Sequence, residues 1–304
     1  MVAGCATPQY AVRGTPVPEE SASALQIERQ ISAVQGQEFD RLGARPIGRD
    51  ERLGRLEVQR IVDRLSRVTE RPSLQYRASL YRDQDPNAAS LADGRLYIST
   101  GLIDYLVGRG SRADELAFVL GHEIAHTVAQ HLVKRYRTLQ QQQLLMAIVA
   151  AGASAVTKDA SAGVQQAGRL ALNAASLLQD VANSGYSQAD ELEADQLGIQ
   201  YVIRAGFDPR ASLDLLQDFA RFENPWPFLR THPYSALRRE YLQRYLEETG
   251  RLGPHSSARP PIDEGVRRLR ETQRLYPKDS LSWKNLQRQI DALEGRAGRN
   301  GSAQ

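Results

Sequence analysis

The segment GHEIAH at residues 121–126 constrains this chain more than any other feature. The apolar pattern around the segment predicts one long helix over residues 111–137. Because residues four apart on a helix lie on one face, His122 and His126 project together and can hold one metal ion. Glu123 is offset by one position, so it can reach a water molecule on that ion without binding the metal itself.

Two histidines leave a catalytic zinc site short of one protein ligand. Six residues after His126, where a third histidine could serve, stands Leu132. His131 lies about 140° around the helix from His126, so we expect it at the helix surface. Residues 187–198, SQADELEADQLG, predict a second helix on which Glu191 and Asp195 are again four apart. One of these carboxylates can bind the metal, and the other can accept the N–H of a ligand histidine.

The remaining pattern predicts an α+β fold that is mostly helical and has one small sheet. The expected elements are two helices within 19–70 with a break near 43–48, a strand in 73–82, a hairpin of 87–91 and 95–100, and helices over 187–206 and 234–247. We expect three parts: a tether over 1–18, a catalytic domain over 19–254, and a linker with short helices over 255–304.

Residues 144–156, LLMAIVAAGASAV, form the most apolar stretch. It is shorter than the roughly 20 residues that a membrane-spanning helix needs. We expect it to form one arm of an alanine-rich helical hairpin, with 163–181 as the other arm. Burial in the core is the favoured expectation over contact with a membrane.

The charges and the single cysteine limit the partners. The 39 basic and 36 acidic residues are interspersed and give a net charge of +3, which argues against a nucleic-acid surface. Cys5 is the only cysteine, so neither an intrachain disulfide nor a cysteine metal site can form. Residues 2–5, VAGC, resemble a bacterial lipobox, which predicts a lipid on Cys5. By resemblance, Ala6 after the cysteine directs the protein to the outer membrane.

GHEIAH followed by GYSQADELEADQLG resembles the membrane-associated zinc peptidases that include the CAAX prenyl endopeptidase, HtpX and the BepA-like periplasmic lipoproteins. The resemblance runs from about residue 20 to 250 and includes DPNAASLADGRLYISTGLIDYL and THPYSALRREYL. It implies a zincin-like catalytic domain of the gluzincin type with one zinc ion per chain. The implied ligands are His122, His126 and Glu191, with Glu123 as the general base and Asp195 behind a ligand histidine.

The resemblance also suggests a substrate site and a role for His232. An extended peptide would add as a strand to an exposed edge at Asn87, Ala88 and Ala89. His232 would face the metal, either as a donor that stabilises the oxyanion or as an inhibitory fourth ligand.

The expected function is a zinc-dependent endopeptidase in cell-envelope protein quality control, anchored to the outer membrane in the periplasm. Its partners would be peptide substrates, the membrane through the lipid anchor, and other envelope proteins. The alternative is a lipoprotein chaperone or assembly factor whose zinc only stabilises the fold.

Overall fold

The computed structural model describes residues 15–108, 110, 113–156, 174–183, 185–221, 232, 233 and 235–252, with single residues between 266 and 294. Cys5 and most of the tether, the start of the second hairpin arm and most of the C-terminal part lie outside these residues. The described elements are α1 (Ala22–Arg41), β1 (Arg45–Pro46), α2 (Val58–Ser66), β2 (Arg77–Tyr81), β3 (Ala88–Ser90), β4 (Arg95–Ser99), α3 (Thr100–Gly108), α4 (Ala113–Val128), α5 (His131–Val156), α7 (Ala174–Asn183), α8 (Gln188–Arg204), α9 (Ala211–Phe219) and α11 (Ser235–Glu248). The α+β, mostly helical prediction is confirmed.

The sheet is small and mixed, with strand order β1-β2-β4-β3. β3 and β4 form the predicted antiparallel hairpin, and Gly94 in its turn has the positive φ of 96° that glycine accepts without strain. β2 runs parallel to β4, and β1 is a two-residue strand that the sequence pattern did not indicate. In the described sheet β3 is an edge strand, and it lies against α4.

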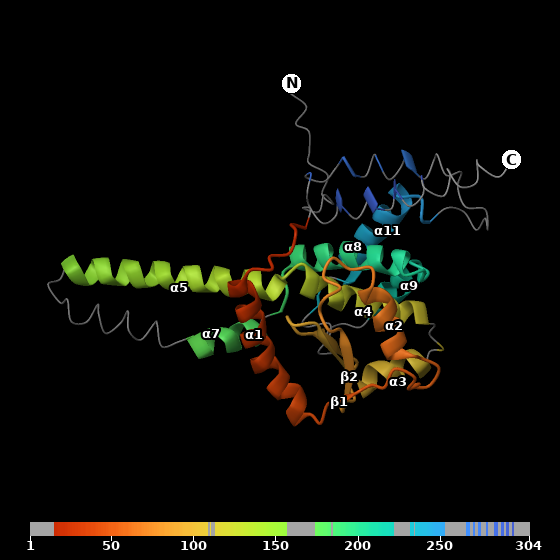
Figure 1. Cartoon of the computed structure of the whole chain (residues 1–304), viewed down its shortest axis with the longest axis horizontal. Helices are drawn as coiled ribbons and strands as arrows, with labels where there is room; N and C mark the ends of the chain where they lie inside the picture. The colour runs from red at the N-terminus through yellow and green to blue at the C-terminus, as the bar shows by residue number, and fades with distance from the viewer. Residues whose placement is uncertain are drawn as a thin grey trace, which may run out of the picture.

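Helices α4 and α8 form the most extensive helix contact, and Figure 1 shows α8 lying along α4 in the body of the molecule. Two glycines allow this close approach. A Cβ atom on Gly198 would lie 2.8 Å from the backbone nitrogen of His122, and one on Gly121 would lie 3.1 Å from the carbonyl oxygen of Gly198. Glu191 and Asp195 on α8 therefore come within side-chain reach of the histidines on α4.

The prediction of one helix over 111–137 is wrong, because α4 ends at Val128 and α5 begins at His131. Gln130 interrupts the helix with a φ of 55°. Its side chain accepts a hydrogen bond from the backbone nitrogen of Glu19 at 2.7 Å and donates to the Glu28 carboxylate at 2.7 Å. These contacts with the N-terminal part of the chain stabilise a turn that local helix propensity does not favour.

The expectation that residues 144–156 are buried is also wrong for the side chains that the structure describes. Figure 1 shows α5 extending away from the body, with α1 and α7 beside its first half. The large apolar side chains farther along are 59–64% exposed: Leu144, Leu145, Met146, Ile148 and Val149. Among the described residues, no helix combines the length and apolar character needed to cross a membrane.

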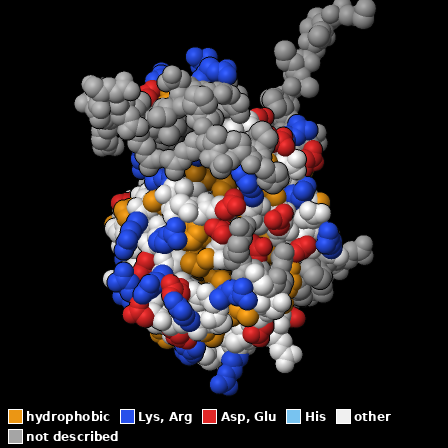
Figure 2. Space-filling view, turned by 90° about the vertical axis from the view of Figure 1, so that its right-hand side faces the viewer, with side chains coloured by type: hydrophobic (Ala, Val, Ile, Leu, Met, Phe, Trp, Pro, Cys, Tyr) orange, Lys and Arg blue, Asp and Glu red, His pale blue; other side chains and the backbone are white. Residues whose placement is uncertain are grey.

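The charged side chains mix both signs over the face seen in Figure 2, as the interspersed sequence pattern indicates. The described residues form no broad area of a single charge on this face.

Candidate metal centre

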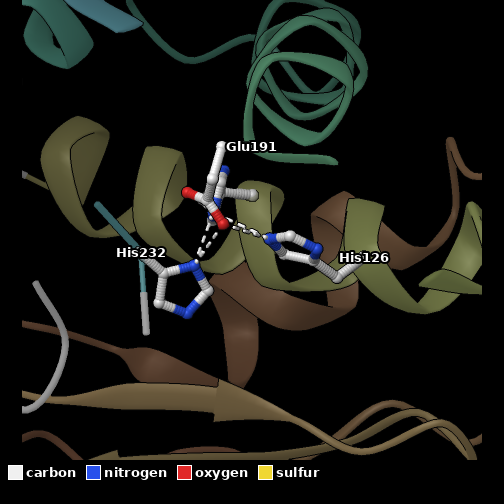
Figure 3. A group of neighbouring side chains, drawn as sticks. His126, Glu191 and His232 are labelled. Carbon is white, nitrogen blue, oxygen red and sulfur yellow. Dashed lines mark hydrogen bonds and ion pairs between the residues drawn. The ribbon is translucent and has the colours of Figure 1, made fainter. Parts of the chain in front are cut away.

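Four buried side chains meet between α4, α8 and the turn before α11: His122, His126, Glu191 and His232. Their potential ligand atoms all lie within 4.8 Å of one another. Figure 3 shows His126 and His232 both directed at the carboxylate of Glu191. Oε1 of this carboxylate is 3.4 Å from Nε2 of His126 and 3.0 Å from Nδ1 of His232.

The distances between these atoms match the ligand shell of a tetrahedral zinc ion. With zinc–ligand distances of 2.0–2.2 Å, neighbouring ligand atoms are about 3.3 Å apart. Nε2 of His122 lies 3.0 Å from Nε2 of His126, 3.4 Å from Glu191 and 3.1 Å from His232. The nitrogen and oxygen donors are those that zinc prefers, so the residues fit this metal.

The charge of the site also favours a divalent cation. Glu123, Glu191 and Asp195 are at most 1% exposed, and among the residues that the structure describes the buried cation beside them is Arg238. With neutral histidines, three carboxylates and one guanidinium leave a formal charge of −2, which is costly to bury without a compensating ion. Burial and Arg238 lower the pKa of His122, but Glu191 and Asp195 outweigh them and raise it to about 9. The site therefore attracts positive charge, and protons and metal compete for it.

Asp195 lies behind His122 and is clamped by an arginine. Its Oδ1 is 2.8 Å from Nδ1 of His122, on the ring side away from the cluster. Arg238 donates two hydrogen bonds to Asp195, at 2.7 and 2.8 Å, and its Nη1 lies 2.8 Å from Glu191. Burial alone would raise the pKa of Asp195, but Arg238 and His122 lower it, so the carboxylate stays charged.

Sequence reasoning missed Arg238. A signal was present, because Arg238 stands three and four residues before Tyr241 and Leu242, on the buried face of α11. A charged residue on such a face needs a buried partner of opposite charge.

Glu123 is held by the edge strand. The backbone nitrogen of Ser90 donates to Oε2 of Glu123 at 2.9 Å, and the Ser90 hydroxyl donates to the Glu123 carbonyl oxygen at 2.6 Å. The other carboxylate oxygen, Oε1, is buried and lies 3.3 Å from Nε2 of His232. Glu123 thus stands beside the cluster with one oxygen fixed and one directed at the site.

The expected substrate residues Asn87, Ala88 and Ala89 lie on and just before this strand. Ser99 donates to the carbonyl oxygen of Asn87, and Leu91 donates to that of Arg95. In an antiparallel pair such bonds alternate, so the backbone of Ala89 faces β4 while the backbones of Ala88 and Ser90 face away from β4. Ala88 and Ser90 are only 1% and 4% exposed, so this side of the strand is covered in the observed conformation. Glu123 bonds to the outward N–H of Ser90, so the same side of β3 runs past the cluster.

His131 is buried, so the prediction that it lies at the helix surface is wrong. The turn at Gln130 brings it back against His126, with the two Nδ1 atoms 2.7 Å apart. Tyr186 stacks on the other side of His126 at a centroid distance of 3.6 Å. Neither contact was predicted, because both depend on how distant segments pack.

An HExxH helix, a carboxylate helix packed on it and an edge strand above it define the class of zincin-like metallopeptidase domains. Residues 53–246 match the description "Peptidase family M48", and the chain belongs to this family. This family implies a divalent metal.

Curated relatives include metallopeptidases of mitochondria and bacteria. The chain is 29% identical to "Mitochondrial metalloendopeptidase OMA1" of Schizosaccharomyces pombe over 197 residues, 64% of this chain and 53% of the relative. It is 32% identical to "Beta-barrel assembly-enhancing protease" of Escherichia coli over 163 residues, 52% of this chain and 32% of the relative. The matches thus span between about a third and a half of these relatives' lengths.

Proposed function

We propose that the chain is a zinc-dependent endopeptidase. The observation that carries this proposal is the buried cluster of formal charge −2, in which donors suited to zinc stand beside Glu123. His122, His126 and Glu191 would hold the ion, and Asp195 would orient His122. Membership in peptidase family M48 supports the same reaction class.

Glu123 would act as the general base. A bound zinc ion lowers the pKa of a coordinated water molecule towards 7 and polarises the substrate carbonyl. Glu123 would accept the proton of the attacking water on Oε1, since Ser90 already fixes Oε2. The same carboxylate can then donate this proton to the leaving amine.

The substrate would bind as an extended strand along β3. The carbonyl oxygen and N–H of Ala88 and the carbonyl of Ser90 face away from β4, where they would pair with a peptide backbone of any sequence. Both residues are buried in the observed conformation, so binding would require the residues that cover them to move aside. This mode suits an enzyme that accepts misfolded proteins of varied sequence. Among the expected residues Asn87, Ala88 and Ala89, the backbone of Ala88 would form the first hydrogen bonds, because the backbones of Asn87 and Ala89 pair with β4.

His232 would close the site in the observed conformation. Its Nδ1 is within 3.1 Å of both His122 and Glu191, so it would take the fourth place that a catalytic zinc ion keeps for water. This geometry favours the inhibitory-ligand reading of His232 over the oxyanion reading. Activity would then require the turn that carries His232 to move away.

Location and partners extend the proposal to the cell. One relative is named as assisting β-barrel assembly, which supports envelope protein quality control as the role. We propose a catalytic domain over 19–254, a periplasmic location and an outer-membrane lipid anchor on Cys5. The 255–304 segment would contact other envelope proteins. A chaperone without turnover is less favoured, because a binding module has no use for a base held beside the metal ligands.

The test is metal analysis combined with casein cleavage. Purified protein should contain one zinc ion per chain, and Glu191→Ala should lose most of it. Glu123→Gln should keep the zinc and lose about 10²–10⁴-fold in activity. Glu115→Gln is the matched control, because Glu115 is also buried on α4 but lies two turns from His122. Full activity of Glu123→Gln, or wild type without zinc, would refute the proposal.

His232→Ala separates the two readings of that histidine by sign. As an inhibitory ligand its removal opens a coordination position and raises activity, while the loss of an oxyanion donor lowers the rate by about 10²–10³. Initial rates on a quenched fluorescent peptide, at equal zinc occupancy, measure the difference. Unchanged rates and unchanged zinc affinity would exclude both roles.

A further inference from the structure

One ring nitrogen of His126 faces the cluster, and the other points away from Glu191, as Figure 3 shows. This outer nitrogen, Nδ1, is 2.7 Å from Nδ1 of His131. On its far side, Nε2 of His131 is 3.3 Å from Oε2 of Glu193 and 3.7 Å from Oδ1 of Asp190. The three side chains form a line that leads outward from the proposed metal site.

Hydrogen bonding leaves one arrangement of protons along this line when His126 binds a metal. Nε2 of His126 must then present its lone pair to the ion, so the proton is on Nδ1. That proton can only be donated to Nδ1 of His131, which must accept. His131 therefore carries its own proton on Nε2, where the Glu193 carboxylate accepts it.

Glu193 is placed for this role by contacts on both of its carboxylate oxygens. Its Oε2 faces Nε2 of His131 at 3.3 Å. Lys134 lies 3.9 Å from the other Glu193 oxygen and does not touch the His131 ring nitrogen in the described contacts. The Glu193 carboxylate is thus held in place to accept the Nε2 proton of His131.

The interruption of the helix at Gln130 is what brings His131 against His126. In an unbroken helix His131 would point about 140° away from His126. The φ of 55° at Gln130 returns the ring to His126, and the carboxamide of Gln130 is bonded to Glu19 and Glu28 on the N-terminal side. Such a backbone conformation is uncommon for a residue other than glycine, and it persists only where surrounding contacts stabilise it.

The two ligand histidines differ in what stands behind them. His122 has the Asp195 carboxylate at 2.8 Å, whereas His126 has a neutral imidazole with its carboxylate one residue farther out. A fourth carboxylate in direct contact would raise the buried formal charge from −2 to −3. An intervening imidazole orients His126 without that cost.

We propose that His131 is a positioning residue for the metal centre, which fixes the tautomer and the ring orientation of His126 by accepting its Nδ1 proton and passing the link to Glu193. The proposal rests on the metal site of the proposed function. It gives no role to His131 as a metal ligand or as a group that contacts substrate. Loss of such an outer partner typically weakens metal binding 10–100-fold.

Two amide variants test it as a matched pair. The oxygen of His131→Asn can stand where Nδ1 stood and accept from His126, whereas the amide of His131→Gln reaches the Nε2 position and leaves His126 without an acceptor. The zinc dissociation constant, from chelator competition, should rise about 10–100-fold for His131→Gln and stay near wild type for His131→Asn. Tyr136→Phe, buried farther along α5, is the control and should not change it.

The visible spectrum of the cobalt-substituted protein gives a second readout that a purely structural role would not move. Its bands should shift in His131→Gln and return in His131→Asn, because they report the orientation of the ligand rings. Equal zinc affinities and equal cobalt spectra for the two variants would overturn the inference and leave the metal site standing. Wild type without zinc binding would instead remove the proposed function together with the inference.

Discussion

The contact between α4 and α8 differs from the outer half of α5 in which side chains are buried. The first buries charged side chains, and the second exposes apolar ones. On α4 every residue from Glu115 to Val128 is buried, including two glutamates and two histidines. On α5 residues 138–156 include no charged residue, yet the large apolar side chains described between 144 and 149 are 59–64% exposed. Apolar composition therefore does not decide which helix becomes the core. A partner helix that approaches closely and pairs the polar groups decides it.

We expect the largest effect on stability when the cation that pairs the buried carboxylates, Arg238, is removed. Arg238→Met leaves Asp195 and Glu191 buried without compensation, and it should lower the free energy of unfolding by about 3–5 kcal/mol. The measurement is urea unfolding with a chelator present, and added zinc should restore part of the loss. Arg239→Met is the control, since Arg239 is half-buried and donates a hydrogen bond to the neutral side chain of Gln243 on the same helix. Equal effects of the two changes would contradict the account.

A smaller effect is expected from a single methyl group at the helix crossing. The Cβ of Gly198→Ala would meet backbone atoms of Gly121 and His122 at 2.8–2.9 Å, and backbone cannot rotate out of the way. This overpacking should cost about 1–3 kcal/mol and weaken zinc binding as α8 moves outward. Gly108→Ala has open space around the new atom and should be neutral or slightly stabilising. A fully stable Gly198→Ala would show that the helices tolerate a wider separation.

The smallest effect belongs to the exposed part of α5. Leu145→Gln and Met146→Gln replace side chains that are 61% and 64% exposed, so the free energy of unfolding should stay within about 0.5 kcal/mol of wild type. Leu132→Ala on the buried first turn of the same helix should cost several times more. Thermal unfolding of the three variants makes this comparison. A large loss in Leu145→Gln would mean that this segment is covered.

The sequence was most informative where a function depends on spacing along one helix. His122 and His126, and then Glu191 and Asp195, stand four residues apart, and a helix turns such pairs to one side. The hairpin with its turn at Gly94 is similarly local. So is the start of α8, where the Ser187 hydroxyl accepts a hydrogen bond from the backbone nitrogen of Asp190.

Features that depend on distant contacts were not predictable in this way. Gln130 breaks a helix because residues more than a hundred positions earlier bind its side chain. His131 follows from that break, so an angle computed for a continuous helix put it on the wrong side. Arg238 was visible in the sequence as a residue on an apolar face, but its partners could be named only once α8 and α11 were seen together.

The contacts of Arg238 also set the order in which the centre can be completed while the chain is made. Arg238 follows His126 by 112 positions. At 5–20 residues per second, the HExxH segment is synthesised about 6–22 seconds before the guanidinium that pairs Asp195 and Glu191. Long sequence separations of this kind also slow folding, because the intervening chain must be ordered before the contacts form. A nascent chain therefore carries the histidines of the site for some time before it contains the arginine that neutralises the carboxylates of α8.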